Sequence, residues 1–164
     1  MFTLSGHPFG QRRGNGLQEQ HVRARLAQRA CVFQQLSRCR LLARLDAVPQ
    51  EHVLAITAFE SLGESNHRVL SDKSVLLVDD APDRDTYVIT VRTNLTGITA
   101  LKLEALTDPS LPGTGPGRGE VARPNFVLNS FRVTAAEGAS APAPVTFTAA
   151  TASYSQANYR VENL

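Results

Sequence analysis

The sequence of 164 residues contains no tryptophan, one methionine and only two cysteines. No apolar run approaches the roughly 20 residues that a membrane-spanning helix needs. The first 16 residues lack the apolar core and the small-residue cleavage site of a signal peptide. Cys31 and Cys39 form no C-x-x-C pair, which excludes a C-x-x-C-H haem attachment site and a zinc knuckle. We therefore expect two reduced thiols and no haem in this chain.

Motifs of the common catalytic classes are also missing. The histidines at positions 7, 21, 52 and 67 never have the H-x-x-x-H spacing of a zinc hydrolase. The glycine-rich segment 113–119 lacks the lysine of a P-loop, and no G-x-S-x-G nucleophile motif occurs. We therefore expect no enzymatic activity.

Lysine is scarce, with two residues against 15 arginines, and the charges are unevenly placed. Residues 1–45 hold eight arginines and one glutamate, a net charge of +7, whereas residues 46–164 hold nine bases and fourteen acids, a net charge of −5. Clustered arginines can bind nucleic acid or an anionic membrane surface. An upstream or shifted reading frame in GC-rich DNA also yields arginine-rich translation. All three explanations of the basic segment remain open.

The composition and apolar spacing of the basic segment predict two regions, neither of which is a β-strand. Residues 1–16 contain four glycines and no hydrophobic periodicity, which favours a disordered leader. Residues 17–48 contain neither proline nor glycine, and apolar residues recur at i, i+4, i+8, i+11 and i+14. The recurring positions are Val22, Leu26, Ala30, Phe33 and Leu36. This spacing predicts one basic amphipathic α-helix, which Pro49 closes.

Beyond Pro49 the pattern changes to short runs of β-branched and aromatic residues. These runs predict strands at 52–59, 68–70, 75–78, 86–93, 99–106, 126–134 and 145–150, with a hairpin turn at 71–74. Tyr87, Ile89 and Val91 fall on one face of their strand, because side chains alternate across a strand. The predicted fold is mainly β, a small antiparallel β-sandwich or barrel over residues 50–136. A linker at 137–144 and the start of a second, truncated β module at 145–164 would follow.

Candidate binding residues lie in two loops. Asp79, Asp80, Asp83 and Asp85 could offer carboxylate oxygens to calcium, although aspartates also punctuate loops by bonding backbone amides. The second loop, residues 108–124, holds four prolines and four glycines and cannot be regular structure. Its Asp108 and Arg118 are ligand-binding candidates, Arg118 as a flexible donor to a carboxylate or an anionic sugar. Tyr87 could stack on a ligand, but strand alternation favours a place in the core.

Five ordered blocks carry a family resemblance: residues 70–76 (LSDKSVL), 83–87 (DRDTY), 95–106 (LTGITALKLEAL), 108–118 (DPSLPGTGPGR) and 125–133 (NFVLNSFRV). Together they resemble a galactose-binding-like, discoidin-related module of large exported planctomycete-type proteins. Those proteins also carry cytochrome c and several domains of unknown function. The resemblance covers about residues 50–164. It implies a jelly roll that binds carbohydrate or a cell surface, and a chain that is a fragment of a larger exported protein.

The sequence departs from this family at two places that bear on binding and geometry. His52 stands where the family has a tryptophan, and sugar sites favour tryptophan or tyrosine because their apolar faces stack on the ring. Lys73 stands where a turn glycine is expected. The sequence therefore predicts a non-catalytic interaction module. There are two alternatives. The chain could be a structural spacer that binds no small ligand, or it could bind nucleic acid or an anionic surface through the arginine-rich segment.

Overall fold

Most of the chain folds into β-strands. The computed structural model describes residues 2–9, 20–28, 36–45, 50–79, 82, 84–119, 121–155 and 160–161. These residues form twelve strands in two antiparallel sheets and one short 3-10 helix, η1 (Pro112–Thr114). The prediction of a mainly β protein is confirmed. Among the described residues, no helix has the length and hydrophobicity that a membrane crossing requires.

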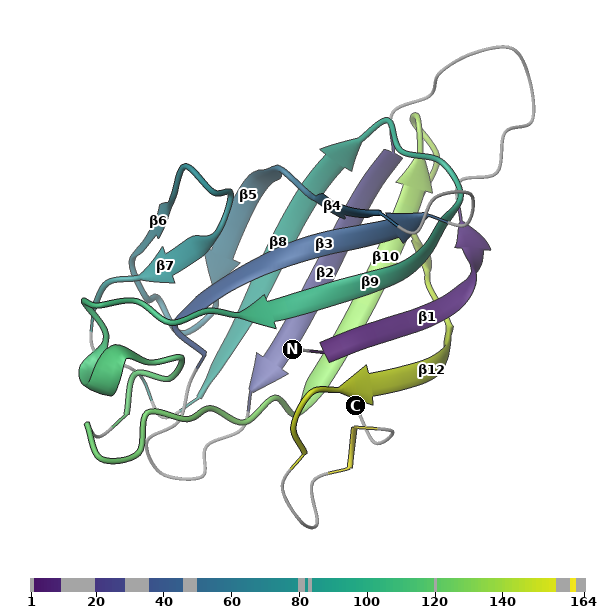
Figure 1. Cartoon of the computed structure of the whole chain (residues 1–164). Coiled ribbons are helices and arrows are strands. Elements are labelled where there is room, and N and C mark those ends of the chain that lie inside the picture. The colour runs from purple at the N-terminus through teal and green to yellow at the C-terminus, as the bar shows by residue number, and fades with distance from the viewer. Residues whose placement is uncertain are drawn as a thin grey trace.

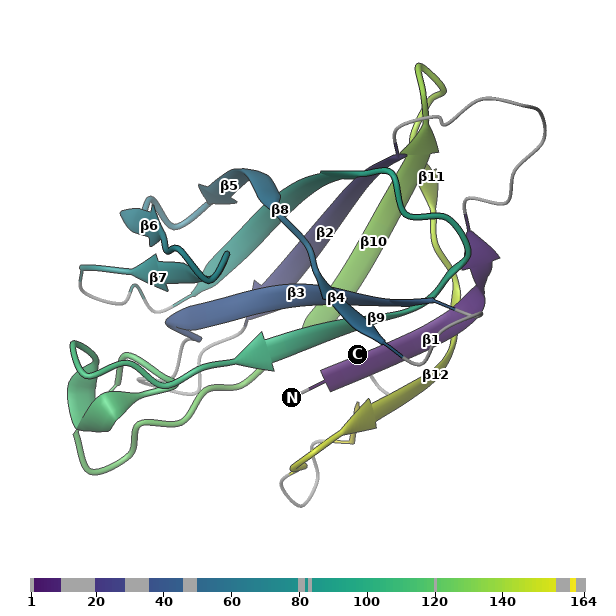
Figure 2. The same cartoon turned by 45° about the horizontal axis from the view of Figure 1, so that its top comes forward.

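The two sheets lie in separate layers (Figure 1). The larger sheet has the order β12 (Phe147–Ala152), β1 (Phe2–Phe9), β9 (Ile98–Ala105), β3 (Arg38–Leu45), β7 (Val75–Leu77), β6 (His67–Val69), with β4 (Glu51–Val53) also paired to β3. The smaller sheet has the order β11 (Ala143–Pro144), β10 (Ser130–Glu137), β2 (Gln20–Gln28), β8 (Asp85–Thr93), β5 (Ile56–Ser61). Figure 2 shows the strands of the two sheets crossing at an angle.

The N-terminal predictions are wrong wherever the structure describes them. Phe2–Phe9 is strand β1 and not disordered, while β2 and β3 occupy the region predicted as a helix. In β3, Cys39, Leu41 and Ala43 are at most 1% exposed. Arg38, Arg40 and Arg44 occupy more exposed alternate positions, as in a half-buried strand, and Leu42, at 4% exposed, is the exception. Apart from Leu36 and Ser37, the remaining residues of 1–48 lie outside the described part.

The change from net positive to net negative charge near residue 46 does not mark a domain boundary. Strand β1 lies between β9 and β12, β2 lies between β8 and β10, and β3 lies between β9 and β7. Strand β12, which the sequence assigned to a second module, pairs with β1 in the same sheet. The arginine-rich segment is therefore part of both sheets, and its interpretation as an appended leader is wrong.

One hydrophobic core lies between the sheets. Leu41 and Leu101 enter it from the larger sheet, and Ile89 and Val133 enter it from the smaller one. Each of these side chains is at most 3% exposed. The core residues from both sheets belong to one contiguous cluster. The molecule is therefore a two-layer β-sandwich, in which the N-terminal strands contribute to the same core as the rest of the chain.

Most strand predictions beyond Pro49 are confirmed, with one informative exception. The predicted strand at 52–59 is two strands, β4 and β5, which belong to different sheets. Leu54 lies between them and is 2% exposed. Its backbone N–H donates to the carbonyl oxygen of Leu41 at 2.9 Å. The chain thus crosses from one layer to the other at a buried, hydrogen-bonded residue.

The predicted hairpin turn at 71–74 joins β6 to β7. The N–H of Lys73 donates to the Leu70 carbonyl at 2.9 Å, and the N–H of Leu70 donates to the Ser74 carbonyl at 2.8 Å. Lys73 has φ of +64°, the left-handed region that glycine adopts without steric cost. Lys73 therefore occupies a position that favours glycine.

We expect Lys73→Gly to stabilise the protein by about 0.5–1 kcal/mol, because relief of left-handed strain exceeds the added entropy of glycine in the unfolded chain. Urea unfolding measures the change. Lys73→Ala is the matched control, since it also removes the 3.4 Å contact of Nζ with the Val53 carbonyl but keeps the strain. A gain for alanine equal to that for glycine would contradict the backbone explanation.

Candidate functional site

The two loops proposed to form a binding surface meet in the structure. The loop that begins at Asp108 contains η1 and returns along the start of β3. There the N–H of Ser37 donates to the Pro116 carbonyl at 2.8 Å, and the N–H of Gly117 donates to the Pro124 carbonyl at 2.9 Å. A Cβ atom on Gly117 would lie 1.8 Å from the Asn125 carbonyl oxygen, so this close approach requires glycine. The proline- and glycine-rich loop is thereby fixed beside Ser37, next to the start of β3.

Arg118 is a buried cross-link and not a flexible surface donor. Its side chain is 3% exposed. Nη1 donates to the backbone carbonyl of Asp79 at 2.9 Å and lies 3.3 Å from its Oδ1 atom. Nη2 donates to Ser65 Oγ at 3.0 Å and to the Tyr87 hydroxyl at 3.4 Å. The prediction that Arg118 reaches out to a ligand is wrong, because its donors bind three neighbouring parts of the chain.

Tyr87 belongs to the core, as strand alternation favoured. Its side chain is fully buried, and its hydroxyl donates to the Leu36 carbonyl at 3.0 Å. Burial raises the pKa of Tyr87 far above its usual value, although the Arg118 cation acts in the opposite direction. A ring with no exposed surface cannot stack on a sugar, so the proposed ligand role of Tyr87 is wrong.

Asp85, a candidate calcium ligand, is 4% exposed and surrounded by protein donors. It accepts hydrogen bonds from Ser61 Oγ at 2.6 Å, from the N–H of Gly63 at 2.8 Å and from the N–H of Thr86 at 2.7 Å. Ser65 Oγ donates to it at 3.3 Å and accepts from Arg118. The carboxylate therefore organises the turn between β5 and β6.

Asp79 lies at the surface and also has protein partners. Its carboxylate accepts from the N–H of Asn66 at 2.9 Å and from Asn66 Nδ2 at 3.0 Å. The backbone bond from Asn66 is the main reason that the pKa of Asp79 is lowered. Asp80 and Asp83 lie outside the described residues. Within the part that the structure describes, no three acidic, histidine or cysteine side chains gather as a metal site, so calcium remains a sequence prediction.

Asp108 forms an ion pair with an arginine that the sequence analysis placed in a helix. Arg38 on β3 donates through Nη1 to Asp108 at 3.1 Å and through Nη2 to Asp72 at 2.8 Å. Ser110 donates to Asp108 through its hydroxyl at 2.7 Å and its N–H at 3.0 Å. These two bonds are the main cause of the lowered pKa of Asp108, and the Arg38 charge adds to them. Sequence reasoning missed Arg38 because it treated residues 1–48 as separate from the sandwich.

A second set of ion pairs covers the outer face of the larger sheet. Arg40 donates twice to Glu104, at 2.6 and 2.9 Å. Lys102 Nζ lies 3.1 Å from the other oxygen of Glu104 and also pairs with Glu51. Burial raises the pKa of Glu104, but hydrogen bonds from Arg40 and Lys102 outweigh it and hold that pKa below its usual value. Arginines of the basic segment are thus neutralised by acids of the rest of the chain.

We expect Arg38→Gln to lower stability at neutral pH by about 1 kcal/mol, discounted because the pairs are partly exposed. The pKa values of Asp72 and Asp108 are lowered from 3.8 in the fold, for Asp72 mainly by the Ser74 hydroxyl. In this pH range the two carboxyl groups therefore bind more protons in the unfolded chain than in the folded one. The stabilisation that they provide as carboxylates is lost as pH falls below about 4.

Thermal unfolding of both forms between pH 7 and pH 2 tests this account. The difference in stability between wild type and Arg38→Gln should shrink as pH falls through the lowered pKa values. Arg44→Gln is the control, because Arg44 is an exposed arginine of the same strand. A difference that stays constant down to pH 2 would show that the ion pairs with Asp72 and Asp108 do not stabilise the fold.

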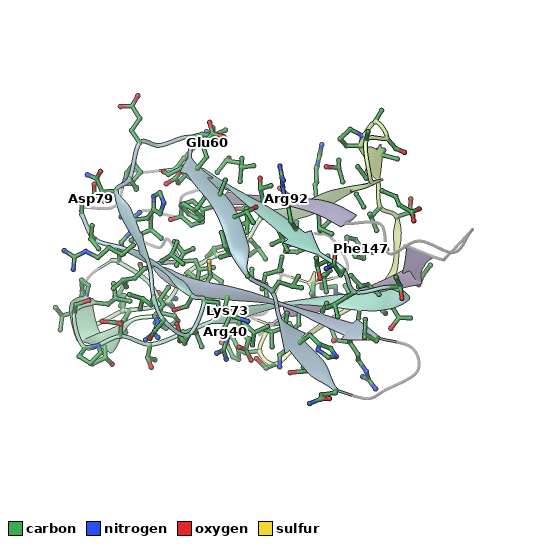
Figure 3. The ribbon with its side chains drawn as sticks, turned by 90° about the horizontal axis from the view of Figure 1, so that it is seen from above. Arg40, Glu60, Lys73, Asp79, Arg92 and Phe147 are labelled. Atoms are coloured by element: carbon green, nitrogen blue, oxygen red, sulfur yellow. The ribbon has the colours of Figure 1, made fainter. Side chains whose placement is uncertain are left out.

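A pocket of about 390 Å³ opens where the two loops meet. It is lined by Arg68, Leu76, Leu77, Val78, Asp79, Ser110, Leu111, Pro112 and Arg118. Leu76, Leu77 and Leu111 contribute apolar atoms to its lining, although each is at most 7% exposed. Arg68 is exposed, and within the described part of the chain it has no ion-pair partner. Figure 3 shows Asp79 at this end of the molecule.

Comparisons with protein-family models, with curated proteins and with solved structures found no match. The resemblance to a galactose-binding-like module therefore remains a prediction from the five sequence blocks. The site must be interpreted from its own geometry. Of the residues predicted to bind a ligand, Arg118, Asp108 and Tyr87 are engaged within the fold, while Arg68 was not identified from the sequence.

Proposed function

We propose that the chain is a non-catalytic binding module, part of a larger multidomain protein, whose ligand is a carbohydrate. The observation that carries this proposal is the pocket between the loops, which Arg68, Asp79 and Ser110 line together with leucine side chains. Its volume lies in the range of small-molecule sites. The two-sheet sandwich agrees with the architecture that the family resemblance implies, and jelly-roll connectivity is part of the proposal.

The polar groups of the pocket favour an acidic sugar. Asp79 already accepts bonds from Asn66 and Arg118, so it has little remaining capacity to accept sugar hydroxyls. Arg68 has its guanidinium available and can pair bidentately with a carboxylate. Leucine side chains of the pocket would contact the C–H face of the ring, in place of the aromatic residue that sugar sites usually contain. The expected ligand is a uronic acid residue of a surface polysaccharide.

Titration of the whole chain with glucuronic-acid oligosaccharides, followed by NMR with and without calcium, tests the proposal. Arg68→Gln should weaken binding about tenfold, because a hydrogen-bonded ion pair contributes about 1.5–3 kcal/mol. Arg123→Gln is the matched control, since Arg123 is exposed and does not line the pocket. No binding of any acidic oligosaccharide, or equal binding by both variants, would overturn the proposal. Arg118→Ala does not serve as this test, because Arg118 is structural.

A structural spacer is the second candidate, and one observation favours it. Arg118, Asp108 and Tyr87 all bond within the fold, as the residues of a module that binds no small ligand would. A negative screen against a broad glycan collection would support the spacer. The nucleic-acid alternative is weakened for Arg38 and Arg40, because both are held in ion pairs with acids of the sandwich.

A further inference from the structure

The pocket lies between two walls that belong to different parts of the chain. Strands β6 and β7 supply one wall, which includes Arg68 and Leu76, and the loop that follows β9 supplies the other, which includes Ser110 and Leu111. Figures 1 and 2 show the start of β3 between β7 and the loop that contains η1. A site built from two segments binds more tightly when their spacing is fixed before the ligand arrives. The start of β3 is therefore placed to set the width of the pocket.

Arg38, at the start of β3, binds a matching turn in each wall. Residues 72–74 (DKS) in the β6–β7 turn and residues 108–110 (DPS) in the loop share the pattern D-x-S. In each turn, one carboxylate oxygen accepts from the N–H and from the hydroxyl of the serine. The other carboxylate oxygen accepts from Arg38, at 2.8 Å in the first turn and 3.1 Å in the second. One guanidinium thus fixes both turns, and through the second it positions Ser110, which lines the pocket.

The remaining donors of Arg38 add to this connection. Its Nε atom donates to Ser74 Oγ at 3.1 Å, and Nη1 also donates to the Thr107 carbonyl at 2.9 Å. The side chains of Arg38 and Asp108 are 19% and 14% exposed, so solvent screens their ion pair only in part. The forked set of donors is what allows one side chain to bind two segments at once.

The loop that forms the second wall is bonded internally and needs attachment to the rest of the fold. The N–H of Asp108 donates to the Thr114 carbonyl at 2.9 Å, and the N–H of Leu111 donates to the Asp108 carbonyl at 3.0 Å. These bonds hold the shape of the loop but do not connect it to β6 or β7. Backbone bonds at the start of β3 and the side chain of Arg118 hold its far end. The side chain of Arg38 connects its near end to the β6–β7 turn.

We propose that Arg38 is a positioning residue for the pocket, which holds the two walls at the spacing that the ligand needs without contacting the ligand. Arg38 is not among the residues that line the pocket. The inference rests on the proposed carbohydrate binding, because it concerns the same pocket. Without the bonds of Arg38, binding must also order the loop, and that entropic cost lowers the affinity.

The first test measures the loop in the free protein. In Arg38→Gln, the NMR order parameters of residues 108–114 should fall from about 0.85, the value of rigid backbone, toward about 0.6. Arg40→Gln is the matched control, because it also removes an ion pair of β3, but one that joins Arg40 to Glu104 and not to the loop. Its loop should keep the order parameters of the wild type. Unchanged order parameters in Arg38→Gln would overturn the proposal.

The second test measures binding of glucuronic-acid oligosaccharides to the full chain. Arg38→Gln should weaken binding about fivefold, equivalent to about 1 kcal/mol, the upper range for a partly exposed ion pair. Arg40→Gln should leave binding unchanged, which a general loss of stability would not explain. Arg38→Lys should restore little, because one ammonium group cannot bind both turns as the fork does.

The outcomes separate this inference from the proposed function. If the wild type binds and Arg38→Gln binds equally well, the positioning role is wrong and the pocket is still a binding site. If the wild type binds no acidic oligosaccharide, the proposed function fails and so does the role of Arg38 in it, whatever the order parameters show. Thermal unfolding checks that each variant is folded. Should Arg38→Gln not fold, Asp72→Asn replaces it, since it removes one charge that Arg38 binds and keeps an oxygen for Ser74.

Discussion

Leu41→Ala is expected to destabilise the whole sandwich by about 2–5 kcal/mol, the range measured for buried leucines. Leu41 lies in β3, has no exposed surface, and pairs with Leu103 in the centre of the larger sheet. Removing its side chain leaves a cavity in the core that both sheets share. Urea unfolding followed by circular dichroism should show one cooperative transition with a lower midpoint.

Leu62→Ala is the matched control for Leu41. Leu62 is 50% exposed, so its truncation should change stability by no more than about 0.5 kcal/mol. If residues 1–48 were an appended helix, Leu41→Ala would leave the unfolding of the sandwich as unchanged as Leu62→Ala does. Equal midpoints for the two variants would therefore contradict the placement of β3 in the core.

Arg118→Ala should cost about 3 kcal/mol, because hydrogen bonds to a charged group contribute about 1.5–3 kcal/mol each and are not additive. The substitution removes the donors that Asp79, Ser65 and Tyr87 share, and it empties the space that the buried side chain fills. The long loop should then detach from β7 and the pocket should lose one wall. The free energy of unfolding measures the first effect, and amide exchange in residues 108–118 measures the second.

The control for Arg118 is Arg123→Ala, since Arg123 is exposed in the same connection. Arg118→Lys should rescue little, because a lysine has one ammonium group and cannot reproduce a forked set of donors. A loss of stability below about 1 kcal/mol for Arg118→Ala would mean that the cross-link is not what holds the loop.

Much of the sandwich beyond Pro49 could be predicted, because apolar residues recur at alternate positions in strands such as β8. Tyr87, Ile89 and Val91 are all fully buried, as their spacing predicts. The N-terminal error has a physical cause. Val22 and Leu26 are four residues apart, a spacing that satisfies both a helical stripe and a strand of period two. The absence of glycine and proline, and the good helix propensity of arginine, then favoured the helix.

The position of the candidate site was predicted better than its chemistry. The two loops do meet, through Arg118 and Asp79. Their roles depend on how the loop of residues 108–118 returns toward β3 and β7, which no local pattern specifies. Tertiary contacts decide that Arg118 is buried and that Arg68, on the short strand β6, is exposed.

On the larger sheet, arginines from the basic part of the chain form ion pairs with acids from the acidic part. Arg38 and Arg40 belong to the basic segment, and their partners Asp72, Asp108 and Glu104 belong to the acidic remainder. Opposite charges that are far apart in sequence are thus brought together by β3.

The most direct test of the central claim, that the arginine-rich segment is an integral part of the sandwich, is the NOE pattern of residues 38–45. The fold predicts interstrand NOEs between Leu41 and Leu103 and between Cys39 and Val75, which are register partners. Medium-range i, i+3 NOEs typical of a helix through residues 38–45, without NOEs to β9 and β7, would contradict this claim.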